Sequence, residues 1–350
     1  MVGVWGYPPD ITPTPFLARK GVRSDGEAIE MPTSSSILDS SELSTKSEGI
    51  VEGVFHHPAR MAPMEGKRSG NKEGRMSQLE KMSLEGKVAI VIVEGRGMGR
   101  EICLHMARAG ADIVAAARAV SEIEAVAQEV RAIGRRALAV RTDVTAPQQI
   151  KAMVDQTIAE LGHVDILVSL GNANARGSEK PIWDNDLEKD FAPNLKWDLL
   201  NHFYCAQAVM KHMVERHTGK IIFDGTAAWW NKGGRHLYVH TMSEGGIVGM
   251  ARALAIEHAR DNIQINVLGT GVFETGEAGG RYEGGRGEYR AQFIPAKRFG
   301  RAPEEGPLAV FLASDASNYI TGQILYLDGG VQPSGLAPIN YFPTIPLMRH

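Results

Sequence analysis

The sequence predicts an α/β fold in which one doubly wound parallel sheet carries helices on both faces. Two observations support this prediction. First, from Lys87 onward, short β-branched runs alternate with amphipathic helical segments, which is typical of parallel strands joined by right-handed helical crossovers. Second, a strand beginning at Val88 runs into a glycine-rich turn and then a helix. In open sheets of this kind, ligands bind beyond the carboxyl ends of the strands.

The expected elements follow from the two periodicities, 2 for strands and 3.6 for helices. We expect seven strands, at Val88–Val93, Asp112–Ala116, Ala137–Arg141, Ile166–Ser169, Lys220–Phe223, Gln264–Leu268 and Ile324–Leu327. We expect helices near Gly99–Ala109, Val120–Ile133, Pro147–Leu161, Trp197–Arg216, Thr241–Ala259 and Glu304–Ala313.

Composition narrows the class of protein. The chain has 350 residues, of which 43% are hydrophobic and 23% charged, as is ordinary for a globular protein. A net charge of −3 gives no electrostatic reason to expect nucleic acid or an anionic membrane as a partner. The only two cysteines, Cys103 and Cys205, exclude a disulfide framework and are expected to be buried thiols. Because no apolar run reaches membrane-spanning length and no export signal opens the chain, we expect a cytoplasmic protein.

The two ends of the chain differ from its middle. Residues 1–82 hold seven of the 17 prolines and sustain neither periodicity, so we expect a disordered leader. Met76 and Met82 stand just before the globular pattern, and whether residues 1–75 belong to the native protein stays open. A single domain is expected over residues 83–331, including a substrate loop at 271–300, and residues 332–350 form a tail.

The turn after the first strand predicts a dinucleotide site. It reads Val93-Glu-Gly-Arg-Gly-Met-Gly99. Glycines there let a pyrophosphate approach backbone N–H groups at the amino end of a helix, where the helix dipole favours an anion. The flanking strand, the helix and a second strand at the right distance make this signal specific.

Over residues 84–330 the chain resembles the short-chain dehydrogenase/reductase (SDR) family, whose members share a Rossmann-type fold. The resemblance includes the glycine-rich turn, Asp143-Val144 after the third strand and the helix Ala251-Arg-Ala-Leu-Ala-Ile-Glu. It extends through Ile265-Asn-Val and Phe273-Glu-Thr to Leu312-Ala-Ser-Asp and the ending Tyr319-Ile-Thr-Gly-Gln-Ile-Leu-Tyr-Leu-Asp-Gly-Gly.

The resemblance implies a set of cofactor-binding residues. These are Gly95, Arg96, Gly97, Met98 and Gly99 in the turn, Arg118 after the second strand, Asp143 and Val144 after the third, and Gly171 and Thr275. Asp143 would meet the adenine amine and Thr275 would anchor the carboxamide. Ala117 stands where an NAD-preferring member has Asp, and Arg118 follows it, so NADP(H) is the expected cofactor.

Several family positions are altered in the cofactor half. Val93 replaces the first glycine, and its side chain is expected to stiffen the turn and enter space where backbone should approach the ligand. The family's Asn-Asn-Ala-Gly is Ser169-Leu-Gly-Asn here, and its Pro-Gly before the substrate loop is Thr270-Gly271.

The catalytic positions are altered as well. By the same resemblance His240 takes the place of the catalytic Tyr, Glu244 that of the Lys, Thr226 that of the Ser and Asp198 that of the Asn. His240 and Glu244 are spaced i, i+4 on one predicted helix and can interact. A carboxylate beside a His fixes its tautomer and stabilises the imidazolium, which gives an acid or base near neutral pH. Thr226 keeps a hydroxyl able to orient a substrate oxygen. No metal is expected.

Trp229, Trp230 and Tyr238 are expected to line the substrate pocket, and two adjacent indoles favour a hydrophobic or aromatic substrate. Three functions stay open. The first is an NADP(H)-dependent oxidoreductase that acts on a carbonyl or alcohol of a small molecule and uses a His–carboxylate pair. The second is a non-redox lyase, isomerase or dehydratase in which His240 is the acid or base. The third is a catalytically inactive binding subunit. The resemblance also implies a homodimer or homotetramer.

Overall fold

The structure is a computed structural model that describes residues 21–22, 28–29, 80–93, 97–171, 181–226, 238–274 and 286–334. The chain divides into two compact units, residues 1–71 and 72–350. In the first unit, β1 (Gly21–Val22) pairs antiparallel with β2 (Ala28–Ile29); the rest of the predicted leader as far as residue 79 lies outside the described residues. In the second unit the description begins with the short helix η1 (Glu80–Met82), just inside the predicted leader boundary.

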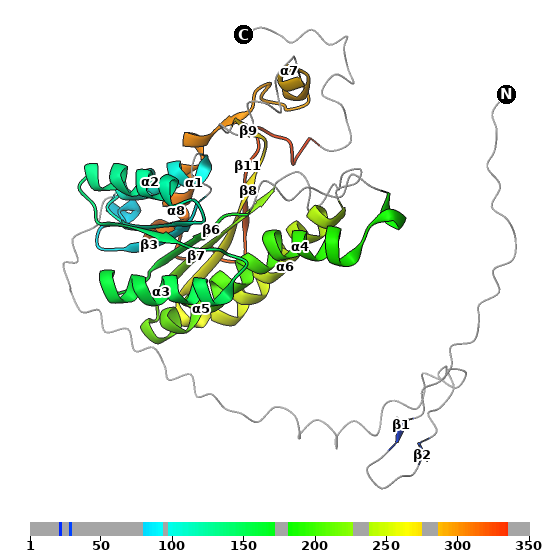
Figure 1. Cartoon of the computed structure of the whole chain (residues 1–350), viewed down its shortest axis with the longest axis horizontal. Helices are drawn as coiled ribbons and strands as arrows, with labels where there is room; N and C mark the ends of the chain where they lie inside the picture. Colours follow the sequence, from blue (N-terminus) through cyan, green and yellow to red (C-terminus); the bar gives the residue numbers. More distant parts are fainter. Residues whose placement is uncertain are drawn as a thin grey trace, which may run out of the picture. The chain divides into compact units, whose positions relative to one another are not determined.

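The second unit is built on a seven-stranded parallel sheet, which confirms the predicted fold class (Figure 1). Its strand order is β11-β8-β7-β6-β3-β4-β5. The strands are β3 (Val88–Ile92), β4 (Asp112–Ala117), β5 (Ala137–Arg141), β6 (Ile166–Ser169), β7 (Gly219–Thr226), β8 (Ile263–Thr270) and β11 (Ile324–Leu327).

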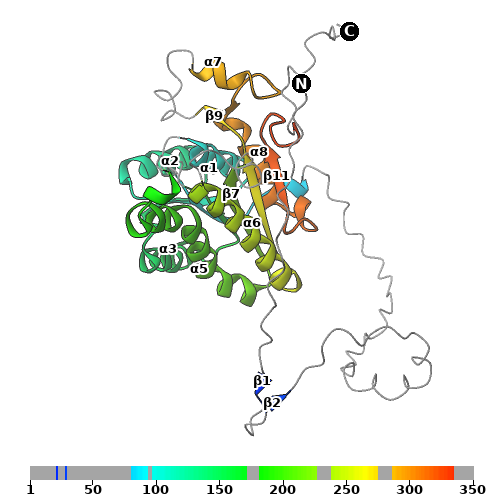
Figure 2. The same ribbon diagram turned by 90° about the vertical axis from the view of Figure 1, so that its right-hand side faces the viewer.

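Helices cover both faces of the sheet (Figures 1 and 2). One face packs against α1 (Met98–Arg108), α2 (Val120–Ala132) and α8 (Gly306–Ala313). The other packs against α3 (Pro147–Leu161), α5 (Asn201–Arg216) and α6 (Tyr238–His258). Successive residues of β3 serve the two cores in turn: Ala89 and Val91 enter the first, whereas Val88, Ile90 and Ile92 enter the second. This alternation is the period-2 geometry of a strand buried on both faces.

Helix boundaries agree with the sequence where the terminating signals are strong. α3 begins at Pro147, whose missing N–H costs nothing in the first turn, and ends before Gly162, which adopts φ 95°. The predicted and observed bounds of this helix are the same. The bounds of β5, β6 and β11 were also predicted as observed.

The segment before α5 differs from the prediction. A helix was expected from Trp197, but the chain forms η2 (Ile182–Asp184), a π-helical turn η3 (Leu187–Phe191), α4 (Ala192–Leu195) and a second π-helical turn η4 (Lys196–Leu200). The sequence also missed β9 (Phe273–Glu274), which pairs with β10 (Gly300–Arg301), and α7 (Arg286–Ala291) within the predicted substrate loop. The short helices η5 (Ala259–Asp261), η7 (Ala302–Glu304) and η8 (Asp315–Ser317) complete the described elements.

A buried acid holds the amino edge of the sheet together. Asp165 accepts a hydrogen bond from the Val88 backbone N–H (2.9 Å), and it forms ion pairs with Arg216 (3.0 Å) and His163 (2.9 Å). Because a buried carboxylate is costly without partners, these contacts tie β3, the segment before β6 and the end of α5 at one point. This edge is opposite to the one where ligands are expected.

Both cysteines are buried and free, as the sequence predicts. Burial raises the pKa of the Cys205 thiol to about 12 and that of Cys103 still further, so neither forms an appreciable thiolate near neutral pH. Among the described residues, no helix combines the length and apolarity needed to cross a bilayer.

Val93 does not enter the ligand space, which corrects the sequence expectation. Its side chain is 2% exposed and belongs to the core on the α1 face. A Cβ added at Gly99 would lie 3.0 Å from both Cα and Cγ1 of Val93, and 3.1 Å from Cδ1 of Leu170. Val93 therefore packs beneath the first turn of α1, and Gly99 is required because the isopropyl group fills that space.

This packing predicts the result of a double-mutant cycle. We expect Gly99→Ala to destabilise the protein by about 1–3 kcal/mol, because the new methyl group overpacks the contact with Val93. In a Val93→Ala background, which removes Cγ1, the same substitution should cost about 1 kcal/mol less. Urea unfolding of the four proteins measures the coupling. Additive free energies would show that the two side chains do not share this space.

Candidate active site

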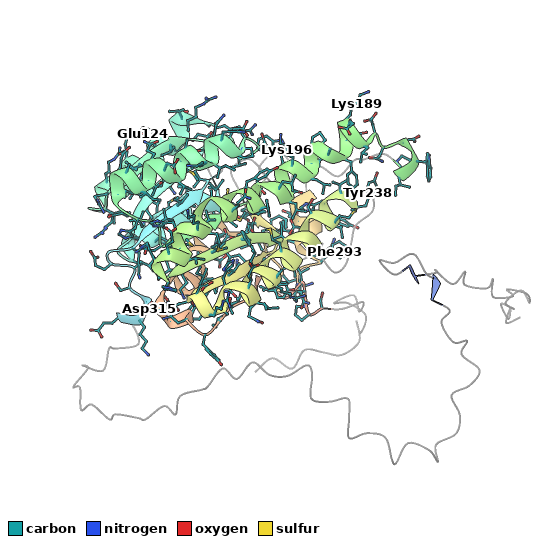
Figure 3. The ribbon with its side chains drawn as sticks, turned by 90° about the horizontal axis from the view of Figure 1, so that it is seen from below. Glu124, Lys189, Lys196, Tyr238, Phe293 and Asp315 are labelled. Carbon is teal, nitrogen blue, oxygen red and sulfur yellow. The ribbon has the colours of Figure 1, made fainter. Side chains whose placement is uncertain are left out.

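The candidate site lies at the carboxyl edge of the sheet, where β7 ends and α6 begins. The π-helical turn η4, which leads into α5, packs against α6 at this point. Tyr238, the first residue of α6, lies at the end of the domain away from Asp315 (Figure 3). Parallel strands place their carboxyl ends on one edge, so the ends of β6, β7 and β8 converge here with η4 and α6.

His240 is the centre of the site. Its Nδ1 donates a hydrogen bond to Oδ2 of Asp198 over 3.0 Å and lies 3.7 Å from Oε1 of Glu244. Asp198 and Glu244 are buried, and the His240 side chain keeps 18% of its surface exposed. We call these three residues the His240 cluster. The sequence predicted all three as site residues, and the structure brings them together.

Two glycines allow this close packing. A Cβ at Gly246 of α6 would lie 2.9 Å from Cδ2 of Leu199, so η4 approaches α6 with Leu199 set against the glycine. This contact carries the neighbouring Asp198 to His240. A Cβ at Gly225 of β7 would lie 3.3 Å from Oε2 of Glu244, so the second glycine leaves room for that carboxylate beside the strand.

Opposing effects set the pKa values in the cluster. Burial on its own would lower the pKa of His240, but the hydrogen bond to Asp198 and the charges of Glu244, Asp198 and Asp224 outweigh it, so the pKa is raised. Burial raises the pKa of the Asp198 carboxyl, and the bond to His240 offsets part of that rise. His240 is therefore held toward its protonated form near neutral pH. Its Nδ1 is engaged by Asp198, so Nε2 is the ring nitrogen left to exchange a proton with a ligand.

Asp224 is a site residue that the sequence reasoning did not single out. Its Oδ1 accepts a hydrogen bond from Oγ1 of Thr270 on β8 over 3.0 Å, and its carboxyl also accepts one from the backbone N–H of Gly171 after β6. It thus joins the ends of β6, β7 and β8. The sequence did hold one signal for Asp224, because an acid two residues before the end of an apolar strand is unusual.

The pKa of Asp224 reflects its surroundings. Protein encloses the carboxyl group, which is the part that titrates, although the residue as a whole keeps some exposed surface. Burial raises the pKa of Asp224 to about 6, the bond from Thr270 opposes that rise, and the charge of Asp198 adds to it.

His202 is a second residue that the sequence reasoning missed. It lies one turn beyond Asp198, is fully buried, and its Nδ1 is 2.8 Å from Oγ of Ser169 at the end of β6. Burial lowers the pKa of His202 to about 3, so the ring is neutral. It therefore supports the end of β6 and does not act as a charged group.

The predicted dinucleotide residues lie at the adjacent strand ends. Gly97 is the N-cap of α1, and among the described residues no side chain caps that helix, so its first N–H groups can face an anion. Arg118, just after β4, is exposed and stacks its guanidinium 4.2 Å above the Trp197 ring. A stacked guanidinium keeps its N–H edge for a phosphate.

Asp143 after β5 completes this arrangement. Its Oδ1 accepts hydrogen bonds from the backbone N–H (2.9 Å) and the hydroxyl (2.7 Å) of Thr145. Burial would raise the pKa of Asp143, but these bonds and the charges of Arg118 and Lys196 lower it. The carboxylate is thus ionised and can accept a hydrogen bond from an adenine amine. Val144 is buried beneath it. The described residues at these strand ends fit a dinucleotide.

Several predicted residues cannot be placed. Gly95, Arg96, Thr275, Trp229 and Trp230 lie outside the described residues, as does the side chain of Thr226, whose backbone pairs with Thr270 at the end of β7. Met98 opens α1 and Gly171 follows β6, as expected. Within the described ranges, no group of His, Cys, Asp and Glu side chains has the arrangement that holds a metal ion.

A cavity of about 150 Å³ lies beside β9 and β10, against the predicted substrate loop. Its lining includes Phe273, Ile294 and Asp328, together with the paired side chains of Arg298 and Glu304. No residue of the His240 cluster lines it. Because proton chemistry needs a titratable group free to exchange, the His240 cluster is the stronger candidate for it than this cavity.

Comparisons with known proteins identify the family. A family profile described as enoyl-(acyl carrier protein) reductase matches residues 92–332. The 2-dehydro-3-deoxy-D-gluconate 5-dehydrogenase of Escherichia coli (strain K12) is 35% identical over 254 residues, which cover 72% of this chain and 98% of that protein. A short-chain type dehydrogenase/reductase from Mycobacterium marinum, solved as a crystal structure, matches with a TM-score of 0.65. It is 31% identical, and the match covers 73% of this chain and 99% of that one. The chain belongs to the short-chain dehydrogenase/reductase family.

SDR members with solved structures include a gluconate 5-dehydrogenase from Burkholderia cenocepacia J2315, determined in complex with NADP and tartrate. It is similar to this chain with a TM-score of 0.67 and 29% identity, over 74% of this chain and all of that one. The proteins that match are named dehydrogenases and reductases, so this SDR chain belongs to a family of oxidoreductases.

The His240 cluster predicts a pKa change that can be measured directly. Asp198→Asn removes the charged acceptor that favours imidazolium, while burial of His240 remains, so the pKa of His240 should fall. NMR titration of its ring protons measures this. Because the native pKa is raised, protonation of His240 stabilises the fold below the unfolded value of about 6.5, and this contribution is lost as pH rises through the native pKa. An unchanged pKa in Asp198→Asn would contradict the pairing.

Proposed function

We propose that this SDR protein is an NADP(H)-dependent oxidoreductase that acts on a carbonyl or alcohol of a hydrophobic or aromatic small molecule. His240, with Asp198 and Glu244, transfers the proton in place of the Tyr and Lys used elsewhere in the family. One observation carries the proposal: a His with a raised pKa is hydrogen-bonded to a buried carboxylate at the carboxyl edge of the sheet.

Two observations support NADP(H) as the cofactor. They are the positions of three described residues and the similarity to a protein that was solved with NADP. Gly97, Arg118 and Asp143 lie at strand ends suited to a pyrophosphate, a 2′-phosphate and an adenine amine respectively. The Burkholderia gluconate 5-dehydrogenase was solved with NADP. A nicotinamide cofactor, when bound, supplies or accepts the hydride.

The chain's own residues handle the proton. When a carbonyl is reduced, Nε2 of protonated His240 donates a proton to the substrate oxygen, while Asp198 keeps hold of Nδ1–H and fixes the ring orientation. When an alcohol is oxidised, the same nitrogen accepts the proton. The buried carboxylates of Asp198 and Glu244 stabilise the imidazolium in both directions. The hydroxyl of Thr226, expected from the sequence, would orient the substrate oxygen.

The proposal is tested by cofactor binding and turnover. Titration with NADPH, followed by energy transfer from tryptophan, should show binding, and a screen of aromatic ketones should show NADPH oxidation. His240→Ala should lower kcat by about 10²–10⁴-fold, the usual contribution of a general acid, with NADPH binding unchanged. A protein without NADPH binding would refute the oxidoreductase. NADPH binding without NADPH oxidation by any substrate, with ketones and cyclic imines both in the screen, would favour the non-redox or the inactive alternative.

Arg118 gives a separate prediction about cofactor choice. Arg118→Ala should weaken NADPH binding by about tenfold or more, because the charge that meets the 2′-phosphate is lost, and should leave NADH binding nearly unchanged. Fluorescence titration with both cofactors measures the ratio. Arg131→Ala, which removes an exposed arginine on α2, is the matched control. Equal loss for NADPH and NADH would mean that Arg118 only supports the fold.

A further inference from the structure

The charge at the proton-transfer site is unusual for carbonyl chemistry. Oδ2 of Asp198 and Oε1 of Glu244 lie 3.0 and 3.7 Å from Nδ1 of His240. Asp224 lies at the end of the neighbouring strand, close enough for its charge to act on both His240 and Asp198. Two carboxyls thus flank one imidazole, and the charge of a third acts on it from the end of β7. Within the described chain, no Lys or Arg side chain forms an ion pair with Asp198 or Asp224.

A further buried acid lies outside this group. Glu305, just before α8, is fully buried, and neither oxygen of its carboxyl has a hydrogen-bond partner among the described residues. Burial and the charge of Asp224 raise the pKa of Glu305 well above its ordinary value. Glu305 is therefore held in its neutral form and adds no negative charge to the site.

The electric field of these carboxylates favours some hydride-transfer reactions over others. Hydride addition to a ketone builds negative charge on the oxygen, and buried carboxylates near that point raise the energy of the transition state. Hydride addition to a protonated imine passes through a transition state that is still partly positive, which the same carboxylates stabilise relative to solution. Because Asp198 and Glu244 lie within 4 Å of the proton-transfer residue, their charges act on the reacting group and not on a remote part of the substrate.

We propose that this SDR protein, beyond the carbonyl and alcohol chemistry proposed above, acts preferentially on substrates with a nitrogen at the reacting carbon, so that it interconverts a cyclic imine, bound as its iminium cation, and the corresponding amine. The inference rests on the proposed oxidoreductase function. In the reducing direction the carbon of the iminium cation gains a hydride, so that C=NH⁺ becomes CH–NH and a neutral amine is formed. The amine nitrogen then takes a proton from Nε2 of His240. The balance is iminium cation + NADPH + H⁺ → ammonium cation + NADP⁺.

The test compares a cationic substrate with a neutral one. NADPH oxidation is measured with 2-methyl-1-pyrroline, which is protonated near neutral pH, and with cyclopentanone. We expect kcat/KM to be at least about tenfold higher for the imine, which corresponds to about 1.4 kcal/mol. Binding of 2-methylpyrrolidinium and of cyclopentanol to the NADP⁺ complex, followed by calorimetry, should show the same preference without turnover.

Two variants show whether the carboxyl charge causes the preference for the imine. Asp224→Asn removes one charge and keeps an oxygen that can accept the hydrogen bond from Thr270; it should lower the ratio of kcat/KM for the imine to kcat/KM for the ketone by about tenfold. Glu257→Gln, at an exposed acid of α6, is the matched control and should change neither.

Each result decides the inference. An imine preference that Asp224→Asn removes supports it. An imine preference unaffected by Asp224→Asn overturns it, because the carboxyl charge would not be the cause. Turnover of ketones at least as fast as imines overturns it and leaves the proposed oxidoreductase standing. Failure to bind NADPH overturns both.

Discussion

Burial of the parallel sheet on both faces is the constraint on which the rest of the structure depends. Every strand pair runs in the same direction, so each connection must cross a face of the sheet and return to the amino edge. The amino edge is closed by ion pairs such as those of Asp165. The carboxyl edge collects the strand ends, and Asp198 of η4 and the α6 residues His240 and Glu244 lie beside them. The chain direction therefore gathers the polar groups of the candidate site at one edge.

At that edge, each buried carboxyl group needs hydrogen-bond donors, and this need determines how the neighbouring elements are arranged. Asp198 has His240 as its donor, and Asp224 has Thr270 and Gly171. Each pairing joins two elements that are distant in sequence. The active site and the packing of the strand ends are therefore one structure, and substitutions at these acids act on both. Separate measurements of stability and of proton affinity are needed to tell the two effects apart.

The sequence predicted most of the fold because strong local signals coincide with element ends, as Pro147 and Gly162 do for α3. It also predicted the His240 cluster, since Glu244 is one helical turn from His240 and the family pattern placed Asp198. It did not reveal that Val93 packs inward, because the direction of one side chain in a turn depends on its tertiary neighbours Gly99 and Leu170. Asp224 was missed for a similar reason: its partners lie on two other strands, and no local spacing relates them.

The π-helical turn η4 has a consequence for the geometry of this site. Its hydrogen bonds run from residue i to i+5, so a π turn holds more residues than an α turn. Each residue of an α-helix advances about 100° around the axis, so loss of one residue between Asp198 and α5 would rotate the aspartate away from α6. The geometry of the pair thus depends on the number of residues as well as on their identity. A chain with the same Asp on an unbroken α-helix before α5 would hold that carboxyl out of reach of the His on α6.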